Sequence, residues 1–141
     1  MNSNQAKPTV AVQFLWVEGP LSKIEQLCLK SFLDHGHEVH LYHYGTVNGI
    51  PDGVFLKDGE DILPKADLFT APSPSGISFA AFANRFRYHL LAAKGGWWFD
   101  TDFVCLQPIP KASRLCFAST WEGPWGECPN NCAIGAIPED P

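Results

Sequence analysis

The pattern that most constrains the fold is an apolar strand, a capped helix and a second strand near the start of the chain. Residues 9–16, TVAVQFLW, are apolar and rich in β-branched side chains, which predicts a buried strand. Ser22 and Glu25 have the spacing of a helix capping box, and Gly36 is placed to end that helix. Residues 38–44, EVHLYHY, predict a second strand. Short connections make this a βαβ unit, which predicts a parallel sheet and an α/β domain.

A second helix is predicted between residues 79 and 94, followed at once by a strand. Gly95 and Gly96 stop the helical pattern, and the aromatic run WWF follows them. Residues 45–78 are rich in Gly, Pro and Asp and predict loops around short elements. The predicted apolar faces are Ile24, Leu27, Cys28 and Phe32 for the first helix, and Phe79, Phe82, Phe86, Leu90 and Ala93 for the second.

Composition narrows the class of protein. The 141 residues, of which 45% are hydrophobic and 18% charged, predict one globular domain over residues 1–141. A formal charge of -5 argues against a nucleic-acid partner, because binding to phosphate backbones needs a basic face. No apolar run reaches the roughly 18 residues of a membrane span, and the start lacks a signal-peptide pattern. Five cysteines, an odd number, are typical of reduced thiols, so we expect a cytoplasmic protein.

Two carboxylates come directly after the predicted aromatic strand. Asp100 and Asp102 are two residues apart, and alternate residues of a strand face the same side. We therefore expect both carboxylates to point at one place just beyond the strand end. Hard oxygen ligands of this kind suit Mg²⁺ or Mn²⁺, which binds through one or two carboxylates plus substrate phosphates.

The second helix is expected to bring polar groups to the same place. From Arg87 to Lys94 the helix rises about 10 Å, and the strand from Gly96 to Asp100 returns about 13 Å. Arg87 is therefore predicted to lie level with Asp100. Asn84 is one turn earlier on the same helix face and is predicted to border the carboxylates. This arrangement would suit a diphosphate that carries a hydroxyl-rich group, at the edge of the sheet where open α/β sheets bind ligands.

These residues also carry a family resemblance. The segment FANRFRYHLLAAKGGWWFDTDFVCLQPI resembles the DXD sugar-binding-motif glycosyltransferases of family 32, whose pattern is approximately S-D-x-x-R-Y-x-x-L-x-x-x-G-G-x-Y-x-D-x-D. The resemblance extends to FLWVEGPLSKIEQLCLKSFLDHGHEVHLYHY and to NNCAIGAIPEDP. It implies a GT-A (Rossmann-like) fold with a mixed, mostly parallel sheet flanked by helices. The chain would be the N-terminal, donor-binding part of such an enzyme, incomplete at its C-terminus.

The resemblance also implies an activity and a role for each matching residue. It implies a nucleoside-diphosphate sugar donor, Mn²⁺ or Mg²⁺, retention of anomeric configuration, and a glycan or lipid-linked acceptor in polysaccharide biosynthesis. Asp102 matches the metal-ligating second aspartate of the motif. Asp100 matches the first, which contacts donor sugar or ribose and supports the metal. Arg87 matches the arginine that holds donor-sugar hydroxyls.

Three donor-binding positions are less regular. Asn84 stands where the family pattern has an aspartate that binds sugar hydroxyls, so the identity of the donor sugar is open. Trp98 replaces the usual tyrosine. Trp16 matches an aromatic residue that stacks on the nucleotide base in similar enzymes, although simple packing in the core would also explain it.

Several alternatives follow from the residues alone. The sequence FDTDFV also matches the D-x-D-x-V opening of haloacid-dehalogenase-type phosphotransferases, in which the first aspartate is a nucleophile. A donor-binding protein without activity is the other alternative. Without the family match, the two aspartates would be solvated turn acids and Arg87 a structural ion-pair partner. Ordinary structural roles are favoured over metal binding for Cys128 and Cys132, and for His35, His37, His40 and His43.

Overall fold

The computed structural model describes residues 10–138, so Thr9, the first residue of the first expected strand, lies outside the described residues. The elements are β1 (Ala11–Leu15), β2 (Gly19–Pro20), α1 (Lys23–Asp34), β3 (Glu38–His43), β4 (Val47–Asn48), β5 (Phe55–Asp58), β6 (Ala71–Ser73), β7 (Gly76–Ser78), α2 (Ala80–Lys94), β8 (Gly96–Phe99), β9 (Cys116–Trp121) and β10 (Glu127–Ala136). Short 3₁₀ helices lie at Gly59–Asp61, Lys65–Asp67 and Gly123–Trp125.

The main sheet has six strands in the order β5-β3-β1-β8-β10-β9. Strands β5, β3, β1 and β8 are parallel to one another, whereas β10 is antiparallel to β8 and β9 is antiparallel to β10. The chain is therefore a mixed, mostly parallel α/β structure of the GT-A-like type. The expected fold class is confirmed, including the βαβ unit formed by β1, α1 and β3.

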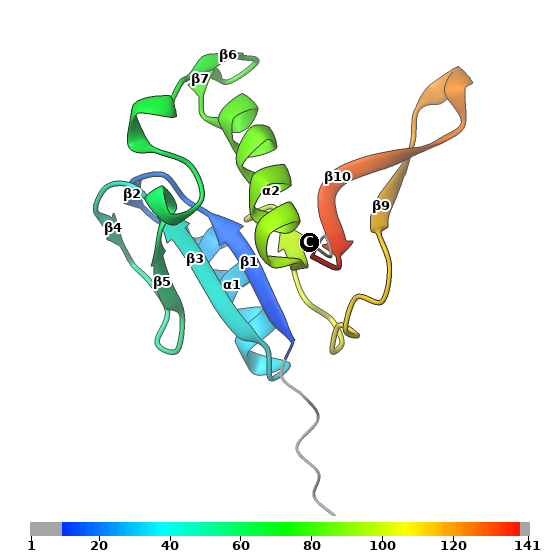
Figure 1. Cartoon of the computed structure of the whole chain (residues 1–141), viewed down its shortest axis with the longest axis horizontal. Coiled ribbons are helices and arrows are strands. Elements are labelled where there is room, and N and C mark those ends of the chain that lie inside the picture. The colour runs from blue at the N-terminus through cyan, green and yellow to red at the C-terminus, as the bar shows by residue number, and fades with distance from the viewer. Residues whose placement is uncertain (1–9, 139–141) are drawn as a thin grey trace, which may run out of the picture.

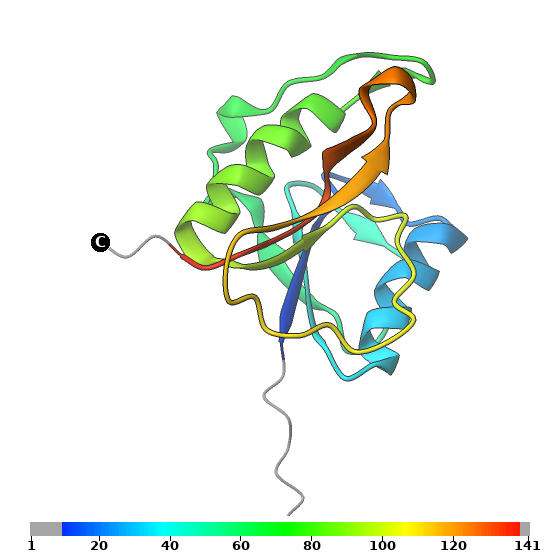
Figure 2. The same cartoon turned by 90° about the vertical axis from the view of Figure 1, so that its right-hand side faces the viewer.

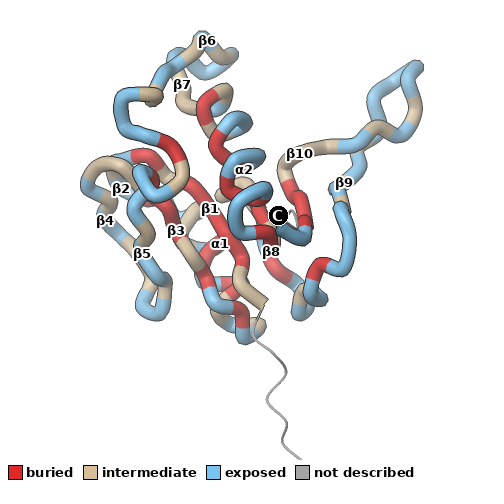
Figure 3. Tube along the Cα trace, viewed as in Figure 1, coloured by how far each residue is buried: buried red, intermediate tan, exposed pale blue. Residues whose placement is uncertain are grey.

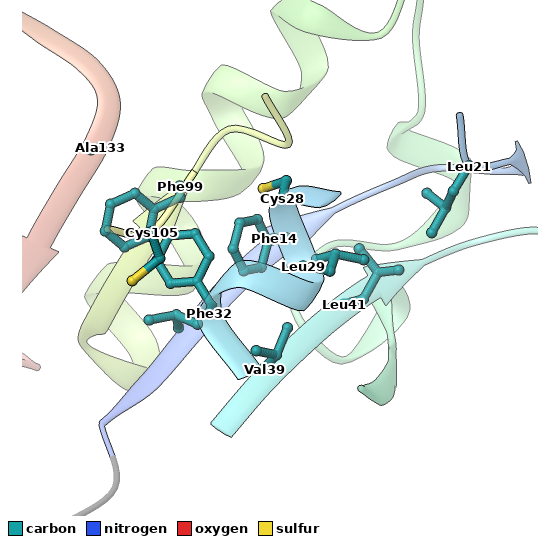
Figure 4. Close-up of a cluster of buried hydrophobic side chains, with 11 residues drawn as sticks. Phe14, Leu21, Cys28, Leu29, Phe32, Val39, Leu41, Phe99, Cys105 and Ala133 are labelled. Atoms are coloured by element: carbon teal, nitrogen blue, oxygen red, sulfur yellow. The ribbon is translucent and has the colours of Figure 1, made fainter. Parts of the chain in front are cut away.

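The two helices cover opposite faces of the sheet (Figure 1, Figure 2). Phe14 and Leu41 pack on one face against α1, with Leu29 and Phe32 of that helix (Figure 4). Leu15 and Tyr42, the next residues along the same strands, join the other cluster under α2. This alternation is the two-residue period of a strand, so both faces of β1 and β3 are buried.

The predicted helix boundaries are confirmed, but parts of the predicted apolar faces are wrong. Ser22 and Glu25 form the capping box, and Gly36 follows α1 with a positive φ of 79°. Ile24 and Leu27 are exposed, because α1 packs on the sheet through its second half. The buried residues of α1 are Cys28, Leu29, Ser31 and Phe32. In α2 Ala93 is exposed, and Leu91 is buried beside Phe82, Phe86 and Leu90.

The turn from α2 into β8 requires its two glycines. Gly95 and Gly96 have φ values of 61° and 87°, a region that disfavours any side chain. A Cβ on Gly95 would also lie 2.5 Å from Pro138 Cδ. The buried Gln13 side chain donates a hydrogen bond of 2.8 Å to the Gly95 carbonyl, so β1 holds this turn in place. The tight turn lets β8 run back directly beneath α2.

Strands β9 and β10 form a hairpin whose turn projects away from the rest of the molecule (Figure 1). Its outer part is largely exposed, whereas the end of β10 beside β8 is buried (Figure 3). Asn130 pairs with Ala118, but the next pair is Ile134 with Phe117, so the ladder is interrupted by a β-bulge. Within residues 10–138 no helix has both the length and the apolarity needed to cross a membrane.

Candidate functional site

A pocket lies at the topological switch point of the sheet, beside β1 and β8. From β1 the chain continues to β3 on one side, while β8 is the neighbour on the other side. Ligands of open α/β sheets bind at such a switch point, at the carboxyl ends of the strands. The pocket has a volume of about 420 Å³, within the range of ligand pockets. Its lining comes from the end of β1 and the segment after it (Leu15, Trp16, Val17, Glu18), from the end of β7 and the first half of α2 (Ser78, Phe79, Ala80, Ala83, Arg87), and from β8 and the segment after it (Trp98, Asp100, Thr101).

Arg87 and Asp100 form an ion pair at one wall of this pocket. The distance from Arg87 Nη1 to Asp100 Oδ1 is 2.9 Å, which confirms that the helix and strand bring these residues level. The Arg87 guanidinium lies 4.8 Å from the ring centroid of Trp98, and Trp98 Nε1 donates a 3.0 Å hydrogen bond to Asp100 Oδ1. Trp98 is almost fully buried, so its contacts hold both members of the pair in place.

Burial shapes the electrostatics of this pair. Burial raises the pKa of the Asp100 carboxyl above its ordinary value, and the charge of Arg87 and the hydrogen bond from Trp98 oppose that rise. Burial likewise lowers the pKa of Arg87, against the attraction of Asp100. Both shifts act against charge, and the attraction between the two groups opposes each of them.

The β-bulge of β10 supplies further contacts that sequence reasoning missed. Arg87 Nη1 donates a short hydrogen bond to the Asn131 carbonyl, and Asp100 N donates one of 2.8 Å to the Cys132 carbonyl. Asn130 Oδ1 in turn accepts a 2.9 Å hydrogen bond from Cys132 N. These are largely main-chain contacts, which leave no residue-type signal in the sequence. The site therefore depends on the hairpin as well as on α2 and β8.

Asp102 differs from Asp100 in its backbone position, its exposure and its contacts. Strand β8 ends at Phe99, and Asp102 lies in the turn that follows, so strand alternation does not relate the two carboxylates as we expected. Asp102 is exposed, and its carboxylate makes no ion pair within residues 10–138. Its charge nevertheless raises the pKa of Asp100, so the two carboxylates lie close enough to interact.

These two carboxylates fit a cation that a substrate helps to hold. In the part of the chain that the structure describes, no group of three or more His, Cys, Asp or Glu residues could bind a metal alone. The solvent-exposed Asp102 and the partly exposed Asp100 together offer oxygen ligands only. Mg²⁺ typically binds through one or two carboxylates and completes its coordination with substrate phosphates and water. The donor set suits that mode and not a closed protein cage.

The neighbouring thiols and the histidines have structural partners. Burial raises the pKa of the Cys28 thiol to about 12, so it stays protonated near Asp100 at neutral pH. Burial also raises the pKa of Cys132. The histidines at positions 35, 37, 40 and 43 have separate partners: the Ser31 carbonyl for His35, the Val10 carbonyl and Ile109 N–H for His37, the Glu38 carboxylate for His40 and the Gly45 carbonyl for His43.

Trp16 and Asn84, the remaining predicted donor contacts, are placed differently from each other. Trp16 is half-buried and lines the pocket, with its Nε1 donating to the Gly19 carbonyl at 3.3 Å. Asn84 is exposed, and the lining given by the described residues does not include it. Its Oδ1 accepts a 3.2 Å hydrogen bond from Asn131 Nδ2, which links it to the bulge rather than to the carboxylates. Contact of either side chain with a donor stays a prediction.

The comparison with protein families agrees with this geometry. Residues 51–121, half of the chain, match the family described as "Glycosyltransferase sugar-binding region containing DXD motif". The matched segment contains α2, β8 and both aspartates. No curated protein matches the chain. Assignment to family 32 in particular stays a prediction. The chain belongs to the family of glycosyltransferase sugar-binding regions that contain a DXD motif.

Proposed function

We propose that this chain binds a nucleoside-diphosphate sugar with Mg²⁺ or Mn²⁺ and transfers the sugar, with retention of configuration, to a glycan or lipid-linked acceptor. The observation that carries the proposal is the pairing of an anchored carboxylate with a free one beside a ligand-sized pocket. Asp100 is held by Arg87 and Trp98, whereas Asp102 is exposed. In this proposal the chain forms one donor-binding domain.

Arg87 would orient the donor sugar. Its Nε donates to the Ala83 carbonyl at 3.2 Å, and its Nη1 donates to the Asn131 carbonyl and forms the ion pair with Asp100. Within residues 10–138 its Nη2 makes no such bond, which leaves a donor for a sugar hydroxyl on a guanidinium that lines the pocket. Because the side chain is buried and held by three partners, it would bind without losing further conformational freedom. Trp16 would stack on the nucleotide base.

The carboxylates would serve the leaving diphosphate. A cation held by Asp102 with support from Asp100 would neutralise the charge that develops on the diphosphate as the sugar–phosphate bond breaks. The ion pair with Arg87 and the hydrogen bond from Trp98, both at Asp100 Oδ1, reduce the nucleophilicity of this carboxylate. The same contacts weigh against a phosphotransferase that would form an aspartyl phosphate there.

The direct test is calorimetric titration with uridine- and guanosine-diphosphate sugars, with Mn²⁺ and with EDTA. We expect binding only with the metal, and Asp102→Asn should remove that dependence. Asp102 is exposed, so the free energy of unfolding of this variant should lie within about 0.5 kcal/mol of that of the wild type. Asp100→Asn is the matched variant, and it should lower the free energy of unfolding by about 1–2 kcal/mol because Arg87 loses a charged partner. Equal donor binding in EDTA would overturn the proposal.

Product analysis separates the alternatives. Incubation with donor and an acceptor panel should release nucleoside diphosphate. Donor binding without any release would favour the binding-only alternative. Release of inorganic phosphate from simple phosphomonoesters would favour the phosphotransferase.

A further inference from the structure

A second pocket, which we call the hairpin pocket, lies between α2 and the β9–β10 hairpin, and we call the pocket lined by Arg87 and Asp100 the donor pocket. The hairpin pocket has a volume of about 380 Å³. Its lining includes Tyr88 of α2 and, from the hairpin, Phe117, Thr120, Glu122, Asn130 and Asn131. None of these residues belongs to the donor pocket.

The chemistry of this lining fits a neutral, hydroxyl-rich ligand. Amides, a hydroxyl and a carboxylate can donate to or accept from sugar hydroxyls in several directions. The described lining contains no Lys, Arg or His, and the Glu122 carboxylate would repel an anion. The rings of Tyr88 and Phe117, on residues that are 51% and 45% exposed, can cover the apolar C–H face of a sugar ring. An anionic ligand such as a phospholipid head group is therefore disfavoured.

A residue of the hairpin pocket contacts a residue of the donor pocket. Arg87 and Tyr88 are consecutive residues of α2, and the first lines the donor pocket while the second lines the hairpin pocket. Asn131 contacts both: its carbonyl accepts from Arg87, and its Nδ2 donates to Tyr88 Oη at 3.2 Å. Asn131 therefore connects the residue that would hold the donor sugar to the lining of the hairpin pocket.

We propose that the hairpin pocket binds a neutral sugar unit of the acceptor, which makes it the acceptor subsite; this proposal rests on the proposed glycosyl transfer. An acceptor hydroxyl would form a bond to the anomeric carbon of the donor sugar. The bond from that carbon to the phosphate oxygen would break, and its electron pair would leave with the nucleoside diphosphate. The hydroxyl proton would pass to the departing diphosphate.

The test is to titrate acceptor oligosaccharides into the protein without donor and to monitor binding by the NMR signals of the backbone amides. The probes are short neutral oligosaccharides that end in glucose, galactose, mannose or N-acetylglucosamine. We expect at least one to shift amide signals of Tyr88 and of residues 117–131. Glu122→Gln should weaken that binding about fivefold, because a charged hydrogen-bond acceptor becomes neutral. Glu122 caps no helix with its side chain, so the fold should tolerate this change.

Matched variants make the result specific. Glu127→Gln carries the same change on the same hairpin, but Glu127 faces Ser119, whose Oγ donates to it at 2.6 Å, and it does not line the pocket that the described residues form. It should bind the oligosaccharide as the wild type does. Tyr88→Ala, a change at an exposed helix position, should weaken binding about tenfold through the lost ring contact.

Two results would overturn the proposal. One is the absence of any shift at residues 117–131 with all four classes of oligosaccharide. The other is a shift that Glu122→Gln and Tyr88→Ala leave unchanged, or that follows only from self-association of the chain in sedimentation. Donor affinity, measured separately by calorimetry, should be the same in Glu122→Gln and in the wild type. Failure of donor binding in the wild type would refute the proposed function itself, whereas donor binding without oligosaccharide binding would refute only the acceptor subsite.

Discussion

The two sides of the site differ in how they are held. The strands β3, β1 and β8 are covered on both faces, and α2 inserts Phe82 and Phe86, which have no exposed surface, into that interior. The β9–β10 hairpin lies at the sheet edge, and its outer part is largely exposed (Figure 3). Trp121 and Trp125 of this hairpin are 75% and 82% exposed. One side is a packed interior, and the other is a polar ribbon with its aromatic rings in water.

Under the two proposals, the two sides of the site would have different roles. The packed side fixes Arg87 and Asp100 through Trp98, and those residues line the donor pocket. The hairpin adds main-chain acceptors at Asn131 and Cys132, which hold the same residues from the other side. Precise charge placement comes from the interior, while the exposed ribbon offers varied side chains to a second ligand. Local stability should therefore be high on the packed side and low at the hairpin turn.

The largest expected loss of stability comes from a substitution in the packed side. Phe86 is fully buried, and its ring centroid lies 5.5 Å from that of Tyr42 and 6.3 Å from that of Trp98. Phe86→Ala should lower the free energy of unfolding by about 3–5 kcal/mol. Trp125→Ala removes a larger ring from the exposed hairpin turn and should cost less than about 0.5 kcal/mol. Urea denaturation of the two variants measures both values. Similar losses would mean that the hairpin turn is packed against something in solution.

The second prediction compares two arginines of α2 that are two residues apart. The side chain of Arg87 is 4% exposed in its pair with Asp100, whereas that of Arg85 is 47% exposed in its pair with Asp67 at 2.9 Å. Arg87→Ala should lower the free energy of unfolding by about 2–3 kcal/mol, less than a fully buried pair because Asp100 is partly exposed. Arg85→Ala should cost less than about 1 kcal/mol.

Donor binding should separate the two arginines further. Arg87→Ala should abolish measurable binding of the nucleoside-diphosphate sugar at temperatures where the variant is folded, and Arg85→Ala should leave it unchanged. Circular dichroism confirms folding, and calorimetry measures the affinity. Equal loss of binding in both variants would show that the overall charge of the helix matters rather than the buried contact.

Local signals in the sequence were enough to predict the packed side. The capping box at Ser22 and Glu25, the βαβ order and the Gly95–Gly96 turn all act over a few residues, so their structure follows from short segments. Helix rise and strand rise then placed Arg87 level with Asp100, and the ion pair confirms it. Regular elements have fixed dimensions, which is why this long-range contact could be calculated.

The hairpin side could not be predicted in this way. The bulge between Asn130 and Ile134 depends on the register of β9 against β10, which no local pattern specifies. Asn131 contacts Arg87 through its carbonyl, a group that every residue has. The turn at Asp102 also differs from the predicted strand continuation, because the pairing of β8 fixes where that strand ends. The predicted apolar face of α1 was wrong at Ile24 for a similar reason, because tertiary packing decides which apolar residues are covered.

The smallest expected effect concerns Asn84, which joins the two sides through Asn131. Its Oδ1 accepts from Asn131 Nδ2 at 3.2 Å, and an aspartate would keep that acceptor while adding a second oxygen and a negative charge. Asn84→Asp should therefore leave the free energy of unfolding within about 0.5 kcal/mol of the wild type. If Asn84 contacts the donor sugar, the stronger acceptor should change the relative affinities of sugars on one nucleotide by about fivefold. Affinity for the free nucleoside diphosphate should stay the same.

Asn130→Asp is the charge-matched control for this last prediction. Asn130 accepts from Cys132 N through Oδ1, and an aspartate keeps that bond while it places the same new charge on the hairpin. Without acceptor present, this control should leave the preference among donor sugars unchanged. If both variants weaken binding of the free diphosphate equally, the effect is long-range repulsion of the phosphates, which added salt should reduce. Asn84 would then only support the bulge, and the discrimination among donor sugars would have to come from residues that line the donor pocket directly.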